Sequence, residues 1–142
     1  MSEGQLRLSL AELTKFLDGA FPAATRAALG EVVSLAPGHV RMRLEPDESL
    51  LRPGGIVSGP AQVALMDVAA YAVVLAHIGA VEMAVTSTMS VSFLRSCKRE
   101  TMTADARLLK LGRRVASVDA RIWQGSEDRL VAQATLGYMI PS

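Results

Sequence analysis

The amino-acid sequence predicts an α+β fold, in which one long helix is wrapped by a curved antiparallel sheet. Residues 60–78 are apolar on nearly every side of a helix, so this helix must be buried all round. The segments on both sides of it alternate apolar and polar side chains, as half-buried strands do. One flat sheet cannot cover a helix on all sides. We therefore expect the sheet to curl around it and a second subunit to complete the cover.

An N-terminal helical segment, residues 1–30, precedes the strands. Ser9-Leu10-Ala11-Glu12 has the pattern of a capping box, and a stripe of Leu and Phe side chains at helical spacing follows it. Pro22 begins a second short helical stretch, which Gly30 ends. We expect this segment to fold together with the rest of the chain as a single domain.

The main part of the domain, residues 31–142, contains the strands and the long helix. The longest loop is expected at residues 46–60, immediately before that helix. Short loops join the last strands, so these strands should be antiparallel neighbours in a meander. The expected strands are residues 32–36, 39–45, 85–94, 101–111, 115–123 and 130–140.

The composition restricts the classes of function. The chain has 142 residues, of which 50% are hydrophobic, and its net charge is +1, so nothing global indicates nucleic acid or an anionic membrane as a partner. A single cysteine, Cys97, excludes an intramolecular disulfide, and residues 1–5 lack the pattern of a secretory signal. Neither a metal site nor a cofactor motif is evident. We expect a soluble cytoplasmic protein.

One carboxylate, Asp67, lies in the second turn of the apolar helix. It disfavours membrane insertion by about 2.5–3.5 kcal/mol. Burying a carboxylate in a protein interior is also costly unless a partner compensates it. A purely structural role is possible, with Asp67 bonded to the backbone or to Tyr71, which lies at i+4 on the same face. The Gly-rich turn over residues 52–60, at the start of the helix, favours a functional role instead.

The sequence from Val57 to Asp67 resembles the signature of hotdog-fold acyl-CoA thioesterases of the PaaI (phenylacetate-pathway) type. These enzymes belong to the 4-hydroxybenzoyl-CoA thioesterase-like superfamily. In that family a His-Gly-Gly turn opens the central helix, and a catalytic carboxylate lies in its second turn. Ser58 stands at the His position, Gly59 and Pro60 stand at the two Gly positions, and Asp67 stands at the carboxylate. The similarity covers roughly Glu31 to Pro141.

The resemblance implies a mechanism and an assembly. It implies that Asp67 is the general base or nucleophile of thioester hydrolysis, and that the Gly59 N–H stabilises the oxyanion. The two residues are about two helical turns apart, so one chain cannot easily supply both to one substrate. Hotdog relatives combine them across a dimer interface. We therefore expect a homodimer at least, with a homotetramer favoured.

Further residues are expected to bind the acyl-CoA substrate. Ser92-Phe93-Leu94-Arg95 and Leu111-Gly112-Arg113-Arg114 resemble a strand end and a hairpin turn of the family, and their cations could bind the CoA phosphates. Gln62 is expected as a polar contact at the subunit interface, and Tyr71 stands where many relatives have a small hydroxyl residue. The expected substrate-binding residues are Ser58, Gln62, Tyr71, Arg95, Lys98 and Arg113.

Alternatives remain open at the level of sequence. The departures at Ser58, Pro60 and Tyr71 are compatible with a hotdog module that binds acyl-CoA without hydrolysing it, as a sensor or carrier. A hotdog dehydratase is disfavoured, because no His lies close to a paired carboxylate in the helix region. Cys97 lies among cations that could favour its thiolate, which makes it a weak candidate nucleophile. The identity of the acyl group is open, and apolar neighbours of Asp67 suggest a medium-sized apolar or aromatic group.

Overall fold

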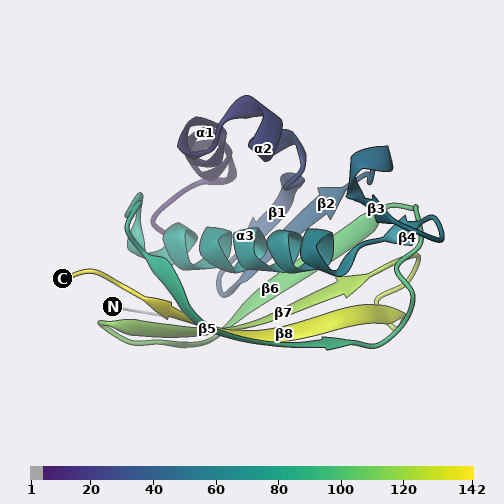
Figure 1. The fold of residues 1–142 in the computed structure, drawn as a ribbon. Coiled ribbons are helices and arrows are strands. Elements are labelled where there is room, and N and C mark those ends of the chain that lie inside the picture. Colours follow the sequence, from purple (N-terminus) through teal and green to yellow (C-terminus); the bar gives the residue numbers. More distant parts are fainter. Residues whose placement is uncertain (1–4) are drawn as a thin grey trace.

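A computed structural model describes residues 5–142 and has the expected α+β architecture (Figure 1). Residues Met1 to Gly4, on which the expectation of a missing secretory signal partly rests, lie outside the described residues. The elements are α1 (Leu10–Ala20), α2 (Ala23–Ala27), β1 (Glu31–Ala36), β2 (His39–Leu44), the 3₁₀-helix η1 (Glu48–Leu50), β3 (Leu51–Arg52), β4 (Ile56–Val57), α3 (Gly59–Ile78), β5 (Val85–Phe93), β6 (Met102–Leu111), β7 (Val115–Trp123) and β8 (Leu130–Met139).

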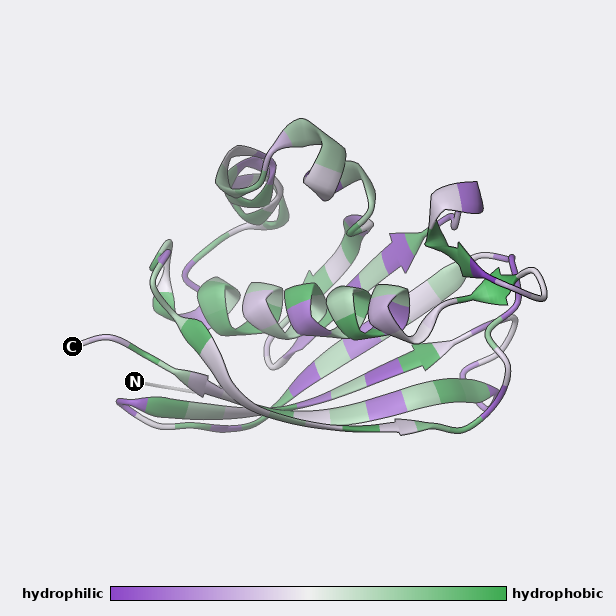
Figure 2. Cartoon of the chain, in the orientation of Figure 1, coloured by the Kyte–Doolittle hydropathy of each residue, from purple (hydrophilic) through white to green (hydrophobic). Residues whose placement is uncertain are grey.

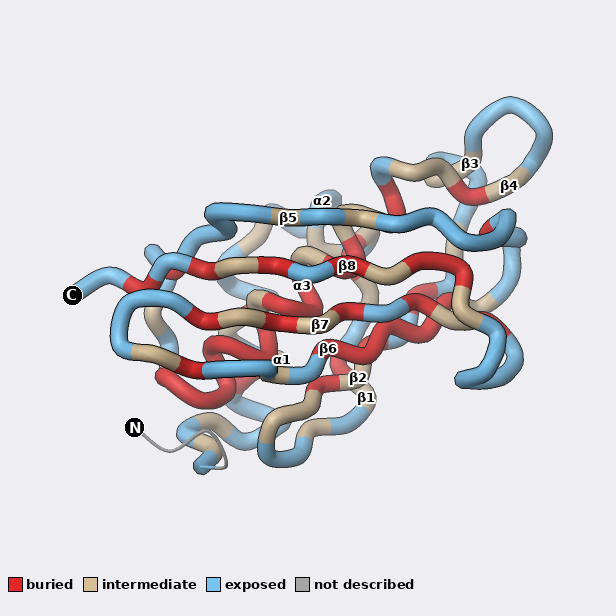
Figure 3. Tube along the Cα trace, turned by 90° about the horizontal axis from the view of Figure 1, so that it is seen from below, coloured by how far each residue is buried: buried red, intermediate tan, exposed pale blue. Residues whose placement is uncertain are grey.

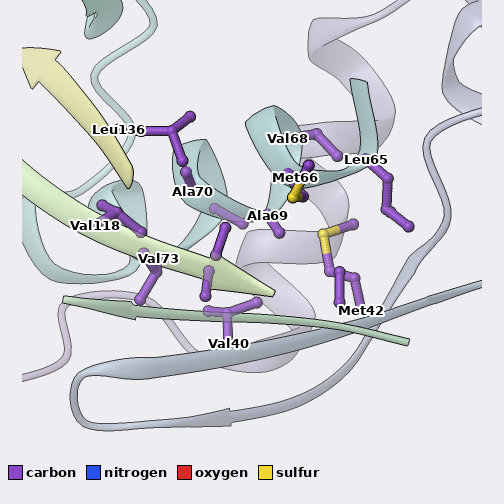
Figure 4. Close-up of a cluster of buried hydrophobic side chains, with 14 of the residues drawn as sticks. Val40, Met42, Leu65, Met66, Val68, Ala69, Ala70, Val73, Val118 and Leu136 are labelled. Atoms are coloured by element: carbon purple, nitrogen blue, oxygen red, sulfur yellow. The ribbon is translucent and has the colours of Figure 1, made fainter. Parts of the chain in front are cut away.

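Helix α3 lies across the concave face of a six-stranded sheet with the order β1-β2-β6-β7-β8-β5 (Figure 1). By length and composition this helix could cross a membrane, but 78% of its apolar stretch is buried inside the fold. Apolar residues gather on α3 and alternate with polar ones along the strands (Figure 2). The close-up in Figure 4 labels Val40 and Met42 from β2, Val118 from β7 and Leu136 from β8 beside the apolar side chains of α3. The central helix is therefore the core of the domain.

A meander of three or four long strands was expected, and the strand order limits it to three. Strands β6, β7 and β8 are consecutive antiparallel neighbours, as the short loops predicted. Strand β5 instead pairs with β8, while β6 pairs with β2 on its other side. The loop between Phe93 and Met102 is long enough to pass β8 and β7, so the first long strand after α3 forms the edge of the sheet. Figure 3 shows β5 as a largely exposed edge strand.

The N-terminal segment covers the side of α3 that faces away from the sheet (Figure 1). The Ser9–Glu12 capping box is present at the start of α1. Leu13 and Leu17 are fully buried, and such burial is worth about 1.5–3 kcal/mol per side chain. The backbone N–H groups of Arg7 and Leu8 both donate to the Ala76 carbonyl near the end of α3. Part of the cover that we assigned to a second subunit is thus supplied by the same chain.

Turns at both ends of α3 fix its position against the sheet. The loop over residues 46–60 is more ordered than its composition predicts, because it contains η1 and the β3–β4 hairpin. At the other end, the fully buried His77 donates from Nδ1 to the Val73 carbonyl (2.7 Å) and accepts at Nε2 from the Gly38 N–H (2.9 Å). His77 therefore joins the end of α3 to the hairpin between β1 and β2.

Candidate active site

Within the described residues 5–142, the start of α3 presents one free backbone N–H group. Ser58 is the N-cap, and its Oγ accepts from the Ala61 N–H at 3.2 Å. Pro60 has no N–H, and the Gln62 N–H bonds to the Ser58 carbonyl. The Gly59 N–H precedes the first intrahelical hydrogen bond, so α3 offers it no partner. A single donor, at the positive end of a 20-residue helix, is thus available to an oxyanion or another negative group.

Asp67 is half-buried on α3, beside β5 and β8, and one of its oxygens is held by two hydroxyl groups. Its Oδ1 accepts from Thr86 Oγ1 at 2.7 Å and from the Tyr138 hydroxyl at 2.6 Å. Thr86 and Tyr138 are paired across β5 and β8, so the sheet itself brings both donors together. The Tyr138 hydroxyl also lies 2.9 Å from the Asp67 carbonyl oxygen.

Asp67 lies in the wall of a cavity of about 1180 Å³ between α1, α3 and the start of β5. The helix α3 contributes Ala64, Asp67, Val68 and Tyr71, which lie on one face because they are three or four residues apart. The N-terminal segment contributes the opposite wall, including α1 side chains. The cavity is thus mostly apolar, and its charged lining residues are Glu12, Lys15, Asp67 and Glu82. An apolar lining with a few polar groups is the usual character of a small-molecule site.

Aromatic residues are concentrated in this cavity. The chain has only one Trp, two Tyr and three Phe. Both Tyr and two of the Phe line the cavity. The Tyr71 ring is the centre of the group: it lies 6.4 Å from Phe16, 6.3 Å from Phe21 and 6.2 Å from Tyr138, between ring centroids. Such distances are typical of favourable aromatic pairs.

Tyr71 and Gln62 have other partners than those expected. The Tyr71 hydroxyl donates to the Glu82 carbonyl (3.1 Å), so the partner of Asp67 is Tyr138 and not Tyr71. Burial and the charge of Glu82 raise the pKa of Tyr71. Gln62 is 5% exposed and lies inside the fold, with its Nε2 3.4 Å from the Val57 carbonyl. One chain already encloses this side chain, and its expected contact at a subunit interface stays a prediction.

The predicted cations do not form one cluster within the chain. The loop that carries Arg95 and Lys98 lies beside the start of α3, because the Val57 N–H donates to the Cys97 carbonyl. Arg113 lies in the β6–β7 turn, at the far end of the 10-residue strand β6, which is roughly 30 Å long. Both groups are exposed. Only Arg95 and Lys98 therefore lie at the same end of the sheet as Gly59.

Cys97 is not the reactive thiol that its cationic neighbours in the sequence suggested. It is free, 1% exposed and part of the core. Burial, with a smaller effect of Glu100, raises the pKa of the Cys97 thiol to about 11. The thiol is thus protonated at neutral pH and inaccessible, so a nucleophilic role for Cys97 is excluded on physical grounds.

Sequence reasoning missed Thr86 and Tyr138. Thr86 lies on a strand with four other Ser and Thr residues, so nothing in the pattern distinguishes it. Tyr138 did carry a signal, because its place in the alternation of β8 put it on the buried face with Leu136. A buried Tyr hydroxyl needs a polar partner, and the carboxylate of the central helix was the obvious one. Within residues 5–142, no group of His, Cys, Asp and Glu side chains could hold a metal ion.

Comparisons with known proteins agree on one family. The family model described as the Thioesterase superfamily matches residues 54–131. A presumed thioesterase of Silicibacter is 38% identical, with a TM-score of 0.88 over 99% of this chain and 97% of that one. A presumed thioesterase of Ralstonia eutropha, related to phenylacetic acid degradation, is 26% identical, with a TM-score of 0.78 over 90% and 98% of the two chains.

Two further relatives add detail. A Streptococcus mutans protein, solved with bound acetyl-CoA, is 27% identical, with a TM-score of 0.69 over 80% of this chain and 89% of that one. A presumed esterase of Saccharolobus solfataricus is 29% identical over 99 residues. That match spans 69% of this chain and 65% of the relative's length.

Proposed function

Because the chain belongs to the thioesterase superfamily and has the hotdog fold of its phenylacetate-pathway relatives, we propose that it hydrolyses acyl-CoA thioesters to a free acid and coenzyme A. The observation that carries the proposal is the position of Asp67. It is a half-buried carboxylate in the wall of a large, mainly apolar cavity, and within the part of the chain that the structure describes hydrogen bonds hold only one of its two oxygens. Buried polar groups are normally satisfied by hydrogen bonds, so the second oxygen of Asp67, beside the cavity, is left to act on a ligand.

Asp67 can act in one of two ways. As a general base it takes a proton from water while the water oxygen attacks the thioester carbonyl carbon. The C–S bond then breaks, and the CoA thiolate leaves and takes up a proton. As a nucleophile, Asp67 attacks the same carbon and releases the thiolate, and water hydrolyses the resulting anhydride. A single turnover in ¹⁸O-labelled water identifies the nucleophilic route when water attacks the anhydride at the Asp67 carbonyl, because only that step leaves the label in Asp67.

We propose that the oxyanion donor is the Gly59 N–H of a second subunit. Gly59 and Asp67 of one chain lie on the same helix, roughly 12 Å apart along its axis, which is too far to serve one carbonyl group. The edge strand β5 supports an assembly, since its nine residues are mostly exposed, including Val85 and Phe93. Long unpaired edges are suited to pairing with another chain. A homodimer is the minimum, and we propose a homotetramer as its final form.

We further propose that CoA binds with its phosphates near Arg95 and Lys98. These cations are exposed and lie at the Gly59 end of the sheet, whereas Arg113 lies at the other end. The relative from Streptococcus mutans, which was solved with acetyl-CoA, makes a CoA ester a reasonable ligand for this fold. The acyl group would occupy the cavity between α1 and α3. A cytoplasmic location, which the free thiol of Cys97 suits, belongs to the same proposal.

A second candidate function is binding of acyl-CoA without turnover. The start of α3 favours it, because Pro60 provides no N–H group and Ser58 occupies that of Ala61. One free donor stabilises an oxyanion less than two do. Loss of a single oxyanion donor typically costs about 10²–10³ in rate, so a slow enzyme or a sensor could result.

The test is release of free thiol from a panel of acyl-CoA esters by wild type and by Asp67→Asn. Hydrolysis predicts thiol release by wild type and a loss of at least about 10²-fold in the variant, with an unchanged melting temperature. Tight acyl-CoA binding without thiol release would favour the sensor. A folded Asp67→Asn variant with wild-type turnover would exclude Asp67 as base or nucleophile.

A further inference from the structure

The two carboxylate oxygens of Asp67 have unequal surroundings. Oδ1 accepts two hydrogen bonds, from Thr86 Oγ1 (2.7 Å) and from the Tyr138 hydroxyl (2.6 Å). Within residues 5–142, Oδ2 accepts none. Since both hydroxyl groups bond to the same oxygen, rotation of the carboxylate about its last torsion angle would break both bonds. The two hydroxyl groups therefore fix which carboxylate oxygen is turned away from β5 and β8.

Tyr138 is the more rigid of the two donors. Thr86 lies on the exposed edge strand, while Tyr138 is 2% exposed and its ring stacks on Tyr71 at a centroid distance of 6.2 Å and an interplanar angle of 27°. Burial and the neighbouring Asp67 charge raise the pKa of the Tyr138 hydroxyl. The hydroxyl therefore keeps its proton at neutral pH, and it can only donate to the carboxylate.

We propose that Tyr138 is a positioning residue, which holds Oδ1 of Asp67 and thereby leaves Oδ2 as the oxygen that acts on water or on the thioester. The inference rests on the proposed role of Asp67, and it adds a residue outside the turn-and-helix signature. The Tyr138 ring lines the cavity, but in this scheme its hydroxyl bonds to Asp67 and not to the substrate. Its removal changes the orientation of the carboxylate during the chemical step and leaves the binding surface for CoA intact.

Kinetics of Tyr138→Phe test the proposal, since this change deletes one oxygen atom and keeps the ring in place. We expect kcat to fall by at least about tenfold, as for a lost hydrogen bond to a charged group, and KM to change by less than about twofold. Thr135→Val serves as the matched control, because it removes a hydroxyl from β8 on an exposed position outside the cavity. It should keep wild-type kcat.

A double-mutant cycle separates positioning from stability. In the Asp67→Asn background, Tyr138→Phe should have little further effect on the residual rate, because the two residues act as a unit. Equal kcat losses in both backgrounds, or a Tyr138→Phe variant with wild-type kcat and only a lower melting temperature, would overturn the positioning role while thioesterase activity stands. Absence of thiol release from the wild type would overturn the positioning role together with the proposed function.

Discussion

The ring of Phe93 lies against Gly59. A Cβ atom added at Gly59 would lie 3.5 Å from the Phe93 Cζ and 3.8 Å from its Cε1, which is ordinary van der Waals contact. Gly59 also has no left-handed backbone, so its conformation admits other residues. The fold therefore does not require glycine at this position. What glycine provides is open space beside the free N–H at the start of α3.

Gly59→Ala should accordingly fold normally and hydrolyse poorly. The added methyl group would fill the space between the helix start and Phe93, where we propose that the thioester oxygen approaches. We expect kcat/KM to fall by at least about tenfold, which is less than for complete loss of an oxyanion donor. Thermal unfolding and the thiol-release assay measure the two effects. An alanine variant with full activity would mean that the oxyanion lies elsewhere.

The cations at the Gly59 end should affect substrate binding and not chemistry. The pair Arg95→Ala and Lys98→Ala should raise KM and spare kcat, since the CoA phosphates lie far from the thioester. Each charge-assisted hydrogen bond to phosphate is worth about 1.5–3 kcal/mol. The increase in KM should vanish with an acyl-pantetheine substrate, which lacks the nucleotide and its phosphates.

Arg113→Ala is the matched control for this experiment, because Arg113 is equally exposed and lies at the other end of β6. If Arg113→Ala raises KM and the double variant at Arg95 and Lys98 does not, the phosphates bind at the β6–β7 turn, either from the same chain or from another subunit.

The sequence was sufficient to predict the three α-helices and the six strands of the main sheet within residues 5–142, but not η1 or the β3–β4 hairpin, because the signals of the longer elements are local. The capping box at Ser9, the period of two along the strands and the turn glycines each depend on a few neighbouring residues. The apolar surface of α3 predicted its burial correctly. The prediction that a second subunit completes the cover of α3 left out α1, which supplies part of that cover. Nothing in the sequence of α1 indicates which surface it packs on.

Strand order and hydrogen-bond partners could not be predicted in the same way. The pairing of β5 with β8 depends on how far the sheet curls around α3, which is a property of the whole fold. The contact of Asp67 with Tyr138 depends on that pairing and joins residues far apart in the chain. Asp67 could be identified as the catalytic candidate from a local motif, whereas its hydrogen-bond partners could not be predicted.

Phe16 should influence the choice of acyl group. It lies on α1, lines the cavity opposite Asp67, and contacts the Tyr71 ring. Phe16→Ala would enlarge this end of the cavity. We therefore expect the ratio of kcat/KM for a longer to a shorter acyl-CoA to rise by about tenfold, within the range that hydrophobic pockets achieve. Leu10→Ala, on the same helix but outside the cavity and 41% exposed, should leave the ratio unchanged. Equal ratios in both variants would mean that the acyl group does not reach α1.

A buried carboxylate on the outer face of the sheet offers a test of stability that is independent of the active site. Asp105 on β6 is 7% exposed and accepts hydrogen bonds from His39, Arg41 and Trp123. Burial alone would raise the pKa of Asp105, but the hydrogen bonds from Arg41, Trp123 and His39 outweigh it and hold this pKa below its usual value. The Arg41 guanidinium also lies 5.3 Å from the centre of the Trp123 ring. The folded state therefore favours the ionised carboxylate.

Because the pKa of Asp105 is lowered on folding, its contribution to stability is complete above the pKa of an unfolded Asp, about 3.9, and is lost as the pH falls through the lower, folded value. Asp105→Asn should lower the free energy of unfolding at neutral pH by about 1.5–3 kcal/mol, as for lost hydrogen bonds to a charged group. The difference from wild type should shrink as the pH falls below about 4.

Asp18→Asn is the control, because it breaks an ion pair whose carboxylate is 60% exposed, and it should lower the free energy of unfolding by only about 0–1 kcal/mol. Urea unfolding at several pH values gives the free energy of unfolding of wild type and of both variants. A difference between wild type and Asp105→Asn that stays constant through the acid range would contradict the assigned ionisation.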